Sequence, residues 1–237
     1  MKCRIADFNV EILCRGRHLQ KICKNYFADF DKADFGFKVL DEDIEKELSS
    51  PYVENRQSAE SLAACRKLLS FAADKDAFLL HAAVFEVGGR GIALIADSGT
   101  GKSTHMLLWQ KLLGEKFSVI NGDKPIVRIF DSVPYAYGTP WCGKEGLTST
   151  KKVALTDLCF IKRSEENKTV KIEKGDAAKR LWSHVMLPRE SSKLLHMAEM
   201  LDKTVKNCNV WEIYCNTDIS AAEEAQKAIF RGETYET

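Results

Sequence analysis

The residues with the clearest chemical potential form the segment 96–103, which reads Ala-Asp-Ser-Gly-Thr-Gly-Lys-Ser. It fits the phosphate-binding pattern G-x-x-x-x-G-K-[ST], except that alanine replaces the first glycine. Backbone N–H groups at a helix N-terminus bind anions, and Gly99 and Gly101 permit a close approach of that backbone. Lys102 is then placed to contact the β- and γ-phosphates of a triphosphate, and the Ser103 hydroxyl to ligate Mg²⁺. The alternative is an ordinary glycine turn that caps a helix.

The elements that must position this segment are a strand before it and a helix after it. The apolar run 91–96 (GIALIA) follows a Gly-Gly-Arg break and the apolar run 77–87, and together they predict a β-hairpin. Residues 102–113 have helical periodicity, and Gly114 provides a C-terminal stop. This order favours phosphate binding over a plain turn.

Two further residues stand near the segment in sequence. Asp123 closes the short apolar strand predicted at 117–120, where an acid at a strand end can face a metal ion. Asn-Gly-Asp is also good turn chemistry, so the alternative for Asp123 is a turn residue. His81 lies in the apolar run before the hairpin turn, where it is either a core histidine or a catalytic group.

The loop predicted at 138–146 holds the candidates for substrate binding. Trp141, Lys144 and Glu145 offer an aromatic surface, a cation and an anion, the mixture that holds an extended chain. A solvated turn is the alternative. On the predicted helix, His105 and Trp109 lie four residues apart and share a face; we expect Trp109 to pack in the core, and the role of His105 stays open.

The rest of the chain mixes strands and helices without a repeat or a long linker, which predicts one α/β domain. Residues 4–40 favour strands or hairpins, and the acidic stretch 41–47 is interpreted as a surface linker. The other predicted strands are 125–130, 133–137, 153–162 and 210–215, and the other predicted helices are 58–73, 176–186, 191–207 and 218–231.

Composition bounds the class of protein. The 237 residues are 45% hydrophobic and 29% charged, as in a globular protein, and the net charge of +1 gives no general attraction to nucleic acid or an acidic membrane. No apolar run has the length of a membrane span or a signal-peptide core, so we expect a cytoplasmic protein without a membrane partner. The eight cysteines lack zinc-ligand spacing and are expected to be reduced and mostly buried.

The sequence resembles the HPr serine kinase/phosphorylase family in three stretches, LLHAAVFEVGGRGIALIADSGTGKSTHMLLW, VINGDKPIV and AYGTPWCGKEG. The resemblance covers roughly residues 62–230 and implies an ATP- and Mg²⁺-dependent kinase that acts on a serine of a protein or peptide. It also implies a P-loop domain with a mixed sheet similar to that of phosphoenolpyruvate carboxykinase, with the N-terminal strands as a side sheet. The predicted domain spans 1–237, with a strand-rich segment at 1–57 and a nucleotide-binding core at 58–237.

The same resemblance assigns roles to particular residues. Phosphate binding is predicted for Ser98, Gly99, Thr100, Gly101, Lys102, Ser103 and Thr104, metal binding for Ser103 and Asp123, and catalysis for Lys102, Asp123 and His81. The family has an acidic pair after the next strand, which is reduced here to Gly122-Asp123. Either Asp123 serves both metal and acceptor, or His81 or Glu145 takes the proton. The phosphorylase activity is not carried over, because its C-terminal signature is missing.

The resulting prediction is transfer of the γ-phosphoryl group of ATP to a serine hydroxyl of a peptide or small protein. The alternatives are a nucleotide-binding regulatory module without its own acceptor, which the missing acid at Gly122 favours, and a small-metabolite kinase. Neither the acceptor nor the oligomeric state follows from the sequence.

Overall fold

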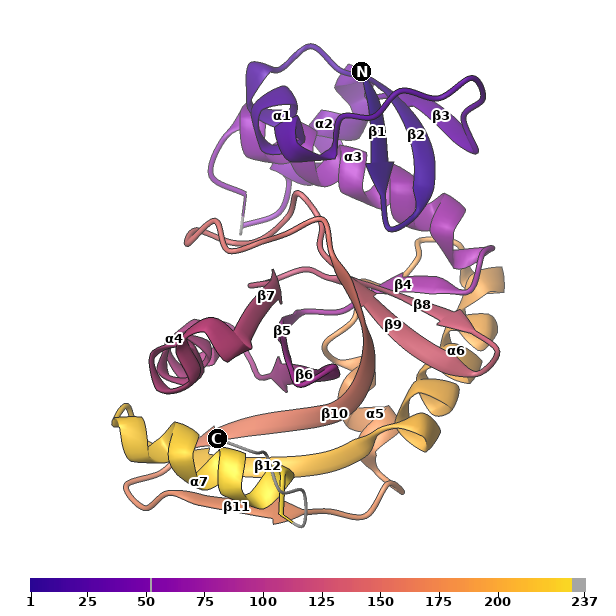
Figure 1. The fold of residues 1–237 in the computed structure, drawn as a ribbon. Helices are drawn as coiled ribbons and strands as arrows, with labels where there is room; N and C mark the ends of the chain where they lie inside the picture. Colours follow the sequence, from indigo (N-terminus) through magenta and orange to yellow (C-terminus); the bar gives the residue numbers. More distant parts are fainter. Residues whose placement is uncertain (52, 232–237) are drawn as a thin grey trace.

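The chain begins with a small sheet in the computed structural model, which describes residues 1–51 and 53–231 (Figure 1). Strands β1 (Lys2–Ile5) and β2 (Phe8–Leu13) form an antiparallel hairpin, and β3 (Phe35–Lys38) pairs with β2 in parallel. Between them lie α1 (Arg17–Ile22) and the 3-10 turn η1 (Lys24–Tyr26). The predicted side sheet is therefore present. Tyr52 and residues 232–237, which the predicted single domain includes, lie outside the described residues.

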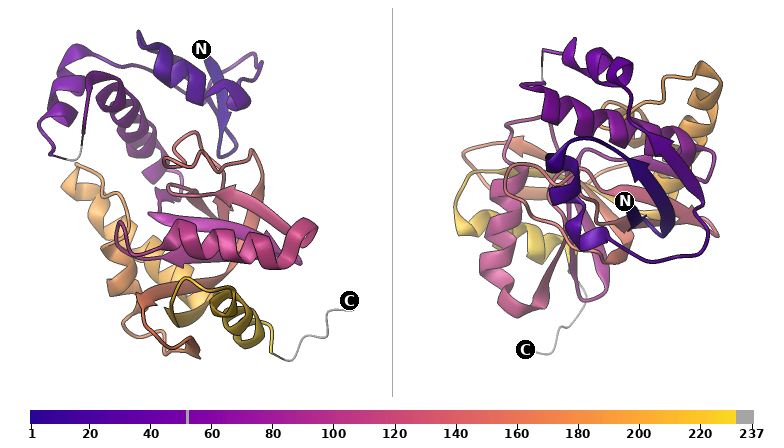
Figure 2. Two further views of the ribbon diagram at one scale, coloured as in Figure 1. Left: turned by 90° about the vertical axis from the view of Figure 1, so that its left-hand side faces the viewer. Right: turned by 90° about the horizontal axis from the view of Figure 1, so that it is seen from above.

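Two helices follow the small sheet. The acidic stretch interpreted as a linker is helix α2 (Asp41–Leu48), so that prediction is wrong: the acidic side chains line its exposed first turn, and Ile44 is buried. Helix α3 (Arg56–Ala73) begins at Asn55, whose side chain accepts a hydrogen bond from the Ser58 N–H. Its apolar face packs both on the small sheet and on the first strands of the large one. Figure 2 shows the course of this helix from two sides.

Within the described residues, the large sheet has nine strands, and the long strand β10 (Lys152–Arg163) joins its parts. The first residues of β10 pair antiparallel with β9 (Val133–Tyr137), which continues to β8 (Ile126–Phe130) and β4 (Ala77–Leu79). The later residues of β10 pair in parallel with β6 (Arg90–Ile95) and β12 (Asn209–Cys215). The mixed sheet curls along β10 (Figure 1). Beyond β6 lie β5 (Ala82–Val87) and β7 (Phe117–Asn121), and β11 (Lys168–Lys171) borders β12.

Helices cover both faces of the curled sheet. Helices α4 (Lys102–Leu113) and α7 (Ile219–Ile229) share a core with β5, β6 and β12, and the fully buried Trp109 lies within it as expected. Helices α5 (Ala177–Trp182) and α6 (Leu194–Asn207) share a second core on the other face. The helix predicted at 176–186 is shorter than expected, because Val185 leaves it to bridge to Leu80.

The apolar run 77–87 is two strands rather than one. Strand β4 pairs with β8, whereas β5 pairs with β6 and β7, and His81 lies at the break between them. The His81 N–H donates to the His184 carbonyl at 2.7 Å instead of to a neighbouring strand. His81 is therefore not a residue within a strand, as the sequence analysis assumed, but a residue at a bend beside segment 96–103.

The cysteines behave as predicted. All eight are free, and all except Cys14 and Cys142 are buried. In the part of the chain that the structure describes, no helix is both long enough and apolar enough to cross a membrane.

Candidate functional site

The loop 96–103 joins the end of β6 to the start of α4, as the sequence predicts. Gly99 and Gly101 have φ values of +79° and +124°, a backbone conformation that favours glycine. Gly101 precedes α4 without a side-chain cap, so the first N–H groups of the helix have no side-chain acceptor. Ala96, which replaces the first glycine of the pattern, is not in the positive-φ region, so its side chain causes no strain there.

Lys102 folds back over this loop. Its side chain is 7% exposed, and Nζ donates to the carbonyls of Ala96 at 2.7 Å and Asp97 at 3.4 Å. Among the described residues, no carboxylate lies within ion-pair distance of Nζ. Burial lowers the pKa of Lys102, and the negative charges of Asp123 and Asp97 partly oppose this effect. The direct contacts of the ammonium are therefore carbonyl oxygens, and the carboxylates that act on it do so from beyond ion-pair distance.

Asp123 lies opposite Lys102 and pairs with two cations or potential cations. Its Oδ1 is 3.1 Å from His81 Nε2, and its Oδ2 contacts Lys124 Nζ. Burial disfavours the ionised carboxylate, but the hydrogen bond from His81 and the charge of Lys124 outweigh burial and lower the pKa of Asp123 to about 2. Asp123 is therefore a carboxylate throughout the physiological range.

Local hydrogen bonds explain why the side chains of Asp123 and His81 meet. Asn121 is fully buried at the end of β7, and its Oδ1 accepts from the N–H groups of Asp123 at 2.9 Å and Lys124 at 2.7 Å. The predicted turn at Asn-Gly-Asp is therefore present, and it fixes the backbone that carries Asp123 beside His81. The Ala82 N–H donates to the Asp123 carbonyl at 3.0 Å, which fixes the bend at His81 beside this turn.

A cavity of about 370 Å³, here called the loop cavity, joins these groups. It brings together most of the predicted site: His81, Ser98, Gly99, Gly101, Lys102, Ser103, Thr104, Asp123, Lys144 and Glu145, together with Gly122 and Gly143. Thr100 does not line it. Thr100 lies on two neighbouring cavities that share Gly99 with the loop cavity.

The prediction for Trp141 is wrong. Its side chain is 8% exposed and packs in the N-terminal core, and Nε1 donates to the backbone and hydroxyl oxygens of Ser61 at 3.1 Å. A buried indole satisfied in this way anchors its loop and offers no surface to a ligand. Lys144 and Glu145, by contrast, are exposed at the rim of the loop cavity.

His105 is buried on α4 at 2% exposure, and neither ring nitrogen has a hydrogen-bond partner in the described structure. Burial lowers its pKa to about 4, so the ring is neutral at physiological pH. It does not line the loop cavity; it lies with Thr104 on a cavity of about 540 Å³ between α4 and the ends of β10 and β12.

Two residues near the site, Lys124 and His184, were not predicted from the sequence. Lys124 contacts the Asp123 carboxylate, and its place directly after the candidate acid is the one signal that could have drawn attention to it. His184 is more than 80 positions from the loop, yet its carbonyl accepts from the His81 N–H. Burial lowers the pKa of His184, and the charges of His81 and Lys102 contribute to this shift. No pattern in the sequence indicates this proximity.

The residues present define what kind of metal ion fits. Among the described residues, no group of three or more histidine, cysteine, aspartate or glutamate side chains could hold a metal. A second acid at position 122 has little space, because a Cβ there would lie 3.2 Å from the Cys142 carbonyl and from Leu147 Cβ. The loop cavity offers the Ser103 hydroxyl, the Asp123 carboxylate and, at its exposed rim, the Glu145 carboxylate. This small set of oxygen donors suits a Mg²⁺ ion that takes its other ligands from phosphate and water.

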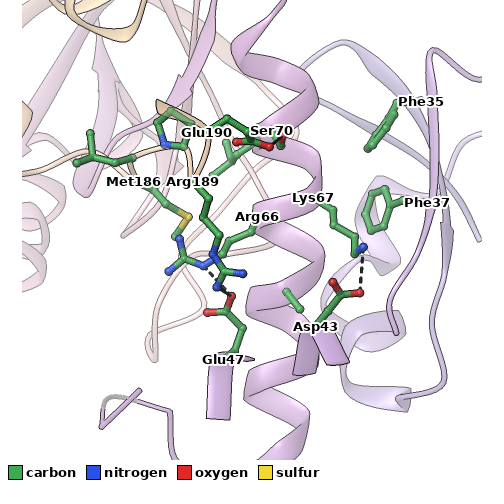
Figure 3. Close-up of a pocket in the computed structure, with 14 residues that line it drawn as sticks. Phe35, Phe37, Asp43, Glu47, Arg66, Lys67, Ser70, Met186, Arg189 and Glu190 are labelled. Carbon is green, nitrogen blue, oxygen red and sulfur yellow. Dashed lines mark hydrogen bonds and ion pairs between the residues drawn. The ribbon is translucent and has the colours of Figure 1, made fainter. Parts of the chain in front are cut away.

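A different cavity, of about 330 Å³, lies between the small sheet, α2, α3 and segment 186–190 (Figure 3). We call it the N-terminal cavity. Most of its charged side chains pair with one another: Lys67 with Asp43 at 2.9 Å, and Glu47 with Arg66 at 2.8 Å and Arg189 at 2.7 Å. None of the predicted site residues lines it.

Comparison with known proteins adds little to this geometry. No family model matches the sequence, and no curated protein matches it. Among solved structures, the HPr(Ser) kinase/phosphatase from Coxiella burnetii aligns with 52% of this chain and 87% of its own, at 10% identity and a TM-score of 0.28. A TM-score this low carries no argument for a shared fold, so membership of that family stays a prediction from the motifs.

Proposed function

We propose that the protein is an ATP- and Mg²⁺-dependent kinase that transfers the γ-phosphoryl group to a serine hydroxyl of a peptide or small protein. The observation that carries this proposal is the loop cavity itself. It places Lys102 and Ser103 of a glycine-rich strand-to-helix loop opposite the His81–Asp123 pair. A phosphate donor and an activated hydroxyl need this juxtaposition.

The phosphates of ATP would bind to the N–H groups at the start of α4. Lys102 would exchange its carbonyl contacts for the β- and γ-phosphate oxygens, which supply the counter-charge that it lacks in the described structure. Ser103 and Asp123 would hold Mg²⁺, with Lys124 giving up its contact with Asp123. The ion supplies charge neutralisation on the transferred group.

The low pKa of Asp123 makes it a poor base, which leaves His81 to take the proton. A neutral His81 that donates Nε2–H to Asp123 keeps Nδ1 as an acceptor. In the transfer, the bond between γ-phosphorus and the β–γ bridging oxygen breaks, and a bond from the serine oxygen to phosphorus forms. The serine proton goes to His81, and ADP leaves.

Two features favour a macromolecular acceptor over a free metabolite. Lys144 and Glu145 at the rim of the loop cavity are exposed, so an extended chain can reach the site past them. The neighbouring cavities that share Gly99 also widen the accessible surface beyond the size of a single small molecule.

The test incubates the full chain with radiolabelled ATP and Mg²⁺ and with two acceptor panels, serine-containing peptides and free hydroxy-metabolites including serine. Labelled peptide supports the proposal. Label on metabolites alone contradicts the peptide acceptor but leaves a kinase. Tight ATP binding without transfer to any acceptor favours the second candidate, a nucleotide-binding regulatory module. That candidate draws its support from Gly122, which stands in place of a second acid and where a Cβ would be tightly packed against Cys142 and Leu147.

A further inference from the structure

A second cavity, of about 600 Å³, opens on another side of the loop 96–103, between the ends of β6 and β10 and helix α5. We call it the cationic cavity. It shares Ser98 and Gly99 with the loop cavity, so the two meet at the loop. The N–H of His81 donates to the carbonyl of His184, which lines the cationic cavity. A ligand seated here thus lies next to the proposed site of phosphoryl transfer.

The charge of this cavity is predominantly positive. Its lining includes the cations Lys162, Arg163 and Arg180, against one carboxylate, Asp97. Glu212 pairs with Lys162 at 2.9 Å and with Arg180 at 2.8 Å, and its side chain is 13% exposed. The Glu212 carboxylate is therefore shared between Lys162 and Arg180, so net positive charge remains in the cavity to attract a ligand.

The cations differ in what they already do. Arg163 donates to the carbonyls of Gly99 and Thr100, which braces the loop. The guanidinium of Arg180 lies 4.0 Å from the centroid of the Phe160 ring, and this stacking together with Glu212 fixes its orientation. A guanidinium held in this way is preorganised to bind a carboxylate through two hydrogen bonds.

Ser98, Gly99 and Thr100 of the predicted phosphate-binding loop also line the cationic cavity, so the test below must separate the acceptor from the nucleotide. The side chains expected to contact the β- and γ-phosphates and the metal ion of the nucleotide lie elsewhere. Lys102 and Ser103, which would hold its phosphates, line the loop cavity and do not line the cationic cavity. We infer that the cationic cavity binds a carboxylate of the acceptor, from an acidic side chain or the C-terminus of the peptide that carries the serine. The inference rests on the proposed kinase function, and it names the acceptor as an acidic peptide.

The test measures peptide binding by calorimetry on the full chain with a non-hydrolysable ATP analogue and Mg²⁺, so it does not depend on turnover. One peptide has glutamates on both sides of its serine, its counterpart has glutamines, and each is made with a free or an amidated C-terminus. We expect the acidic peptide to bind about tenfold more tightly than the neutral one. The two C-terminal forms distinguish side-chain from terminal carboxylate.

Variants of opposite charge then separate recognition from structure. Arg180→Gln is expected to remove the tenfold preference, whereas Glu212→Gln, which releases two cations, is expected to keep or increase it. If the Arg180–Glu212 ion pair merely holds α5 against β12, both variants should weaken binding of the acidic peptide. Lys179→Gln, at an exposed position one residue away on α5, is the charge-matched control and should change nothing.

Several results would overturn the inference. One is equal binding of the acidic and neutral peptides by the unaltered protein. Another is loss of affinity for the ATP analogue in Arg180→Gln, which would assign the cations to the nucleotide. Failure of the kinase proposal looks different: no phosphate transfer at all, while the preference for the acidic peptide and its loss in Arg180→Gln remain.

Discussion

The loop cavity and the N-terminal cavity both hold buried or half-buried charges, but they satisfy them differently. In the N-terminal cavity, Glu47 is 3% exposed and has two arginine partners, so its charge is matched by side chains (Figure 3). In the loop cavity, Lys102 is nearly as buried, yet its contacts are backbone carbonyls. Carbonyl dipoles stabilise an ammonium less than an anion does.

This difference separates a structural charge from a ligand-binding one. A charge paired with opposite side chains stabilises the fold, and an added ligand gains little from it. A cation that contacts only carbonyls is still stabilised further when it meets an anion. Its favourable electrostatic free energy therefore contributes to ligand binding rather than to folding. The comparison therefore predicts that loss of Lys102 in the loop cavity lowers nucleotide affinity and leaves stability nearly unchanged. Loss of Glu47 in the N-terminal cavity should lower stability and leave nucleotide affinity unchanged.

The largest expected effect is that of Lys102→Ala on nucleotide binding. Removing the one buried ammonium at the loop should lower ATP affinity about a thousandfold, because the phosphate charge loses its closest side-chain partner. The melting temperature should stay within a few degrees, since no ion pair is lost. Calorimetric titration and thermal unfolding measure the two quantities, with Lys111→Ala on the exposed face of α4 as control. Unchanged ATP affinity would refute the assignment of the loop.

Asp123→Asn tests the opposite wall of the loop cavity. ATP affinity without metal should remain, whereas the increase in affinity caused by Mg²⁺ should disappear and turnover should fall about a hundredfold or more. The reason is that one substitution removes both a metal ligand and the partner of His81. Asp131→Asn in the exposed turn between β8 and β9 is the control. Normal Mg²⁺-dependent turnover would exclude Asp123 and direct attention to Glu145.

His105 sharpens the comparison, because it is a buried titratable group on the loop helix without any partner. Its pKa is lowered to about 4 from an unfolded value near 6.5, so the folded state resists a proton that the unfolded state accepts. Its contribution to stability is complete above pH 6.5 and is lost as the pH falls towards 4. Between pH 7 and 5 the loss should be about 2 kcal/mol.

The check is denaturant unfolding of the unaltered protein and of His105→Leu across this pH range. The difference in the free energy of unfolding between the two proteins should change with pH by that amount. If the free energy of unfolding had the same pH dependence in the unaltered protein and in His105→Leu, the partnerless state of His105 would be refuted.

The smallest effect is expected for Glu47→Gln in the N-terminal cavity. Stability should fall by about 1 kcal/mol, because two arginines lose their carboxylate but both are exposed enough for water to compensate in part. ATP affinity should not change. Glu45→Gln should cost less, because Glu45, which lies on the same helix as Glu47, forms only an exposed ion pair with Arg56 of α3. A loss of ATP binding in Glu47→Gln would break the distinction between the two cavities.

Sequence alone determined the local elements around the loop. The order of strand, glycine turn and helix follows from apolar periodicity and from the backbone freedom of Gly99 and Gly101, and α4 has the predicted bounds of 102 and 113. These features depend on neighbours a few positions away. Helix α2 was missed for a related reason: its buried apolar face is small, so charge dominated the pattern.

Tertiary structure decided which distant residues share a cavity and which charges have partners. The bend at His81, the burial of Trp141 and the nearness of His184 depend on hydrogen bonds to Asp123, Ser61 and His81, at separations in the chain of more than 40 residues. The cationic cavity arises because β6 and β10 run in parallel and end at the same edge of the sheet. Such pairings depend on the register of whole strands, which no short stretch of sequence specifies.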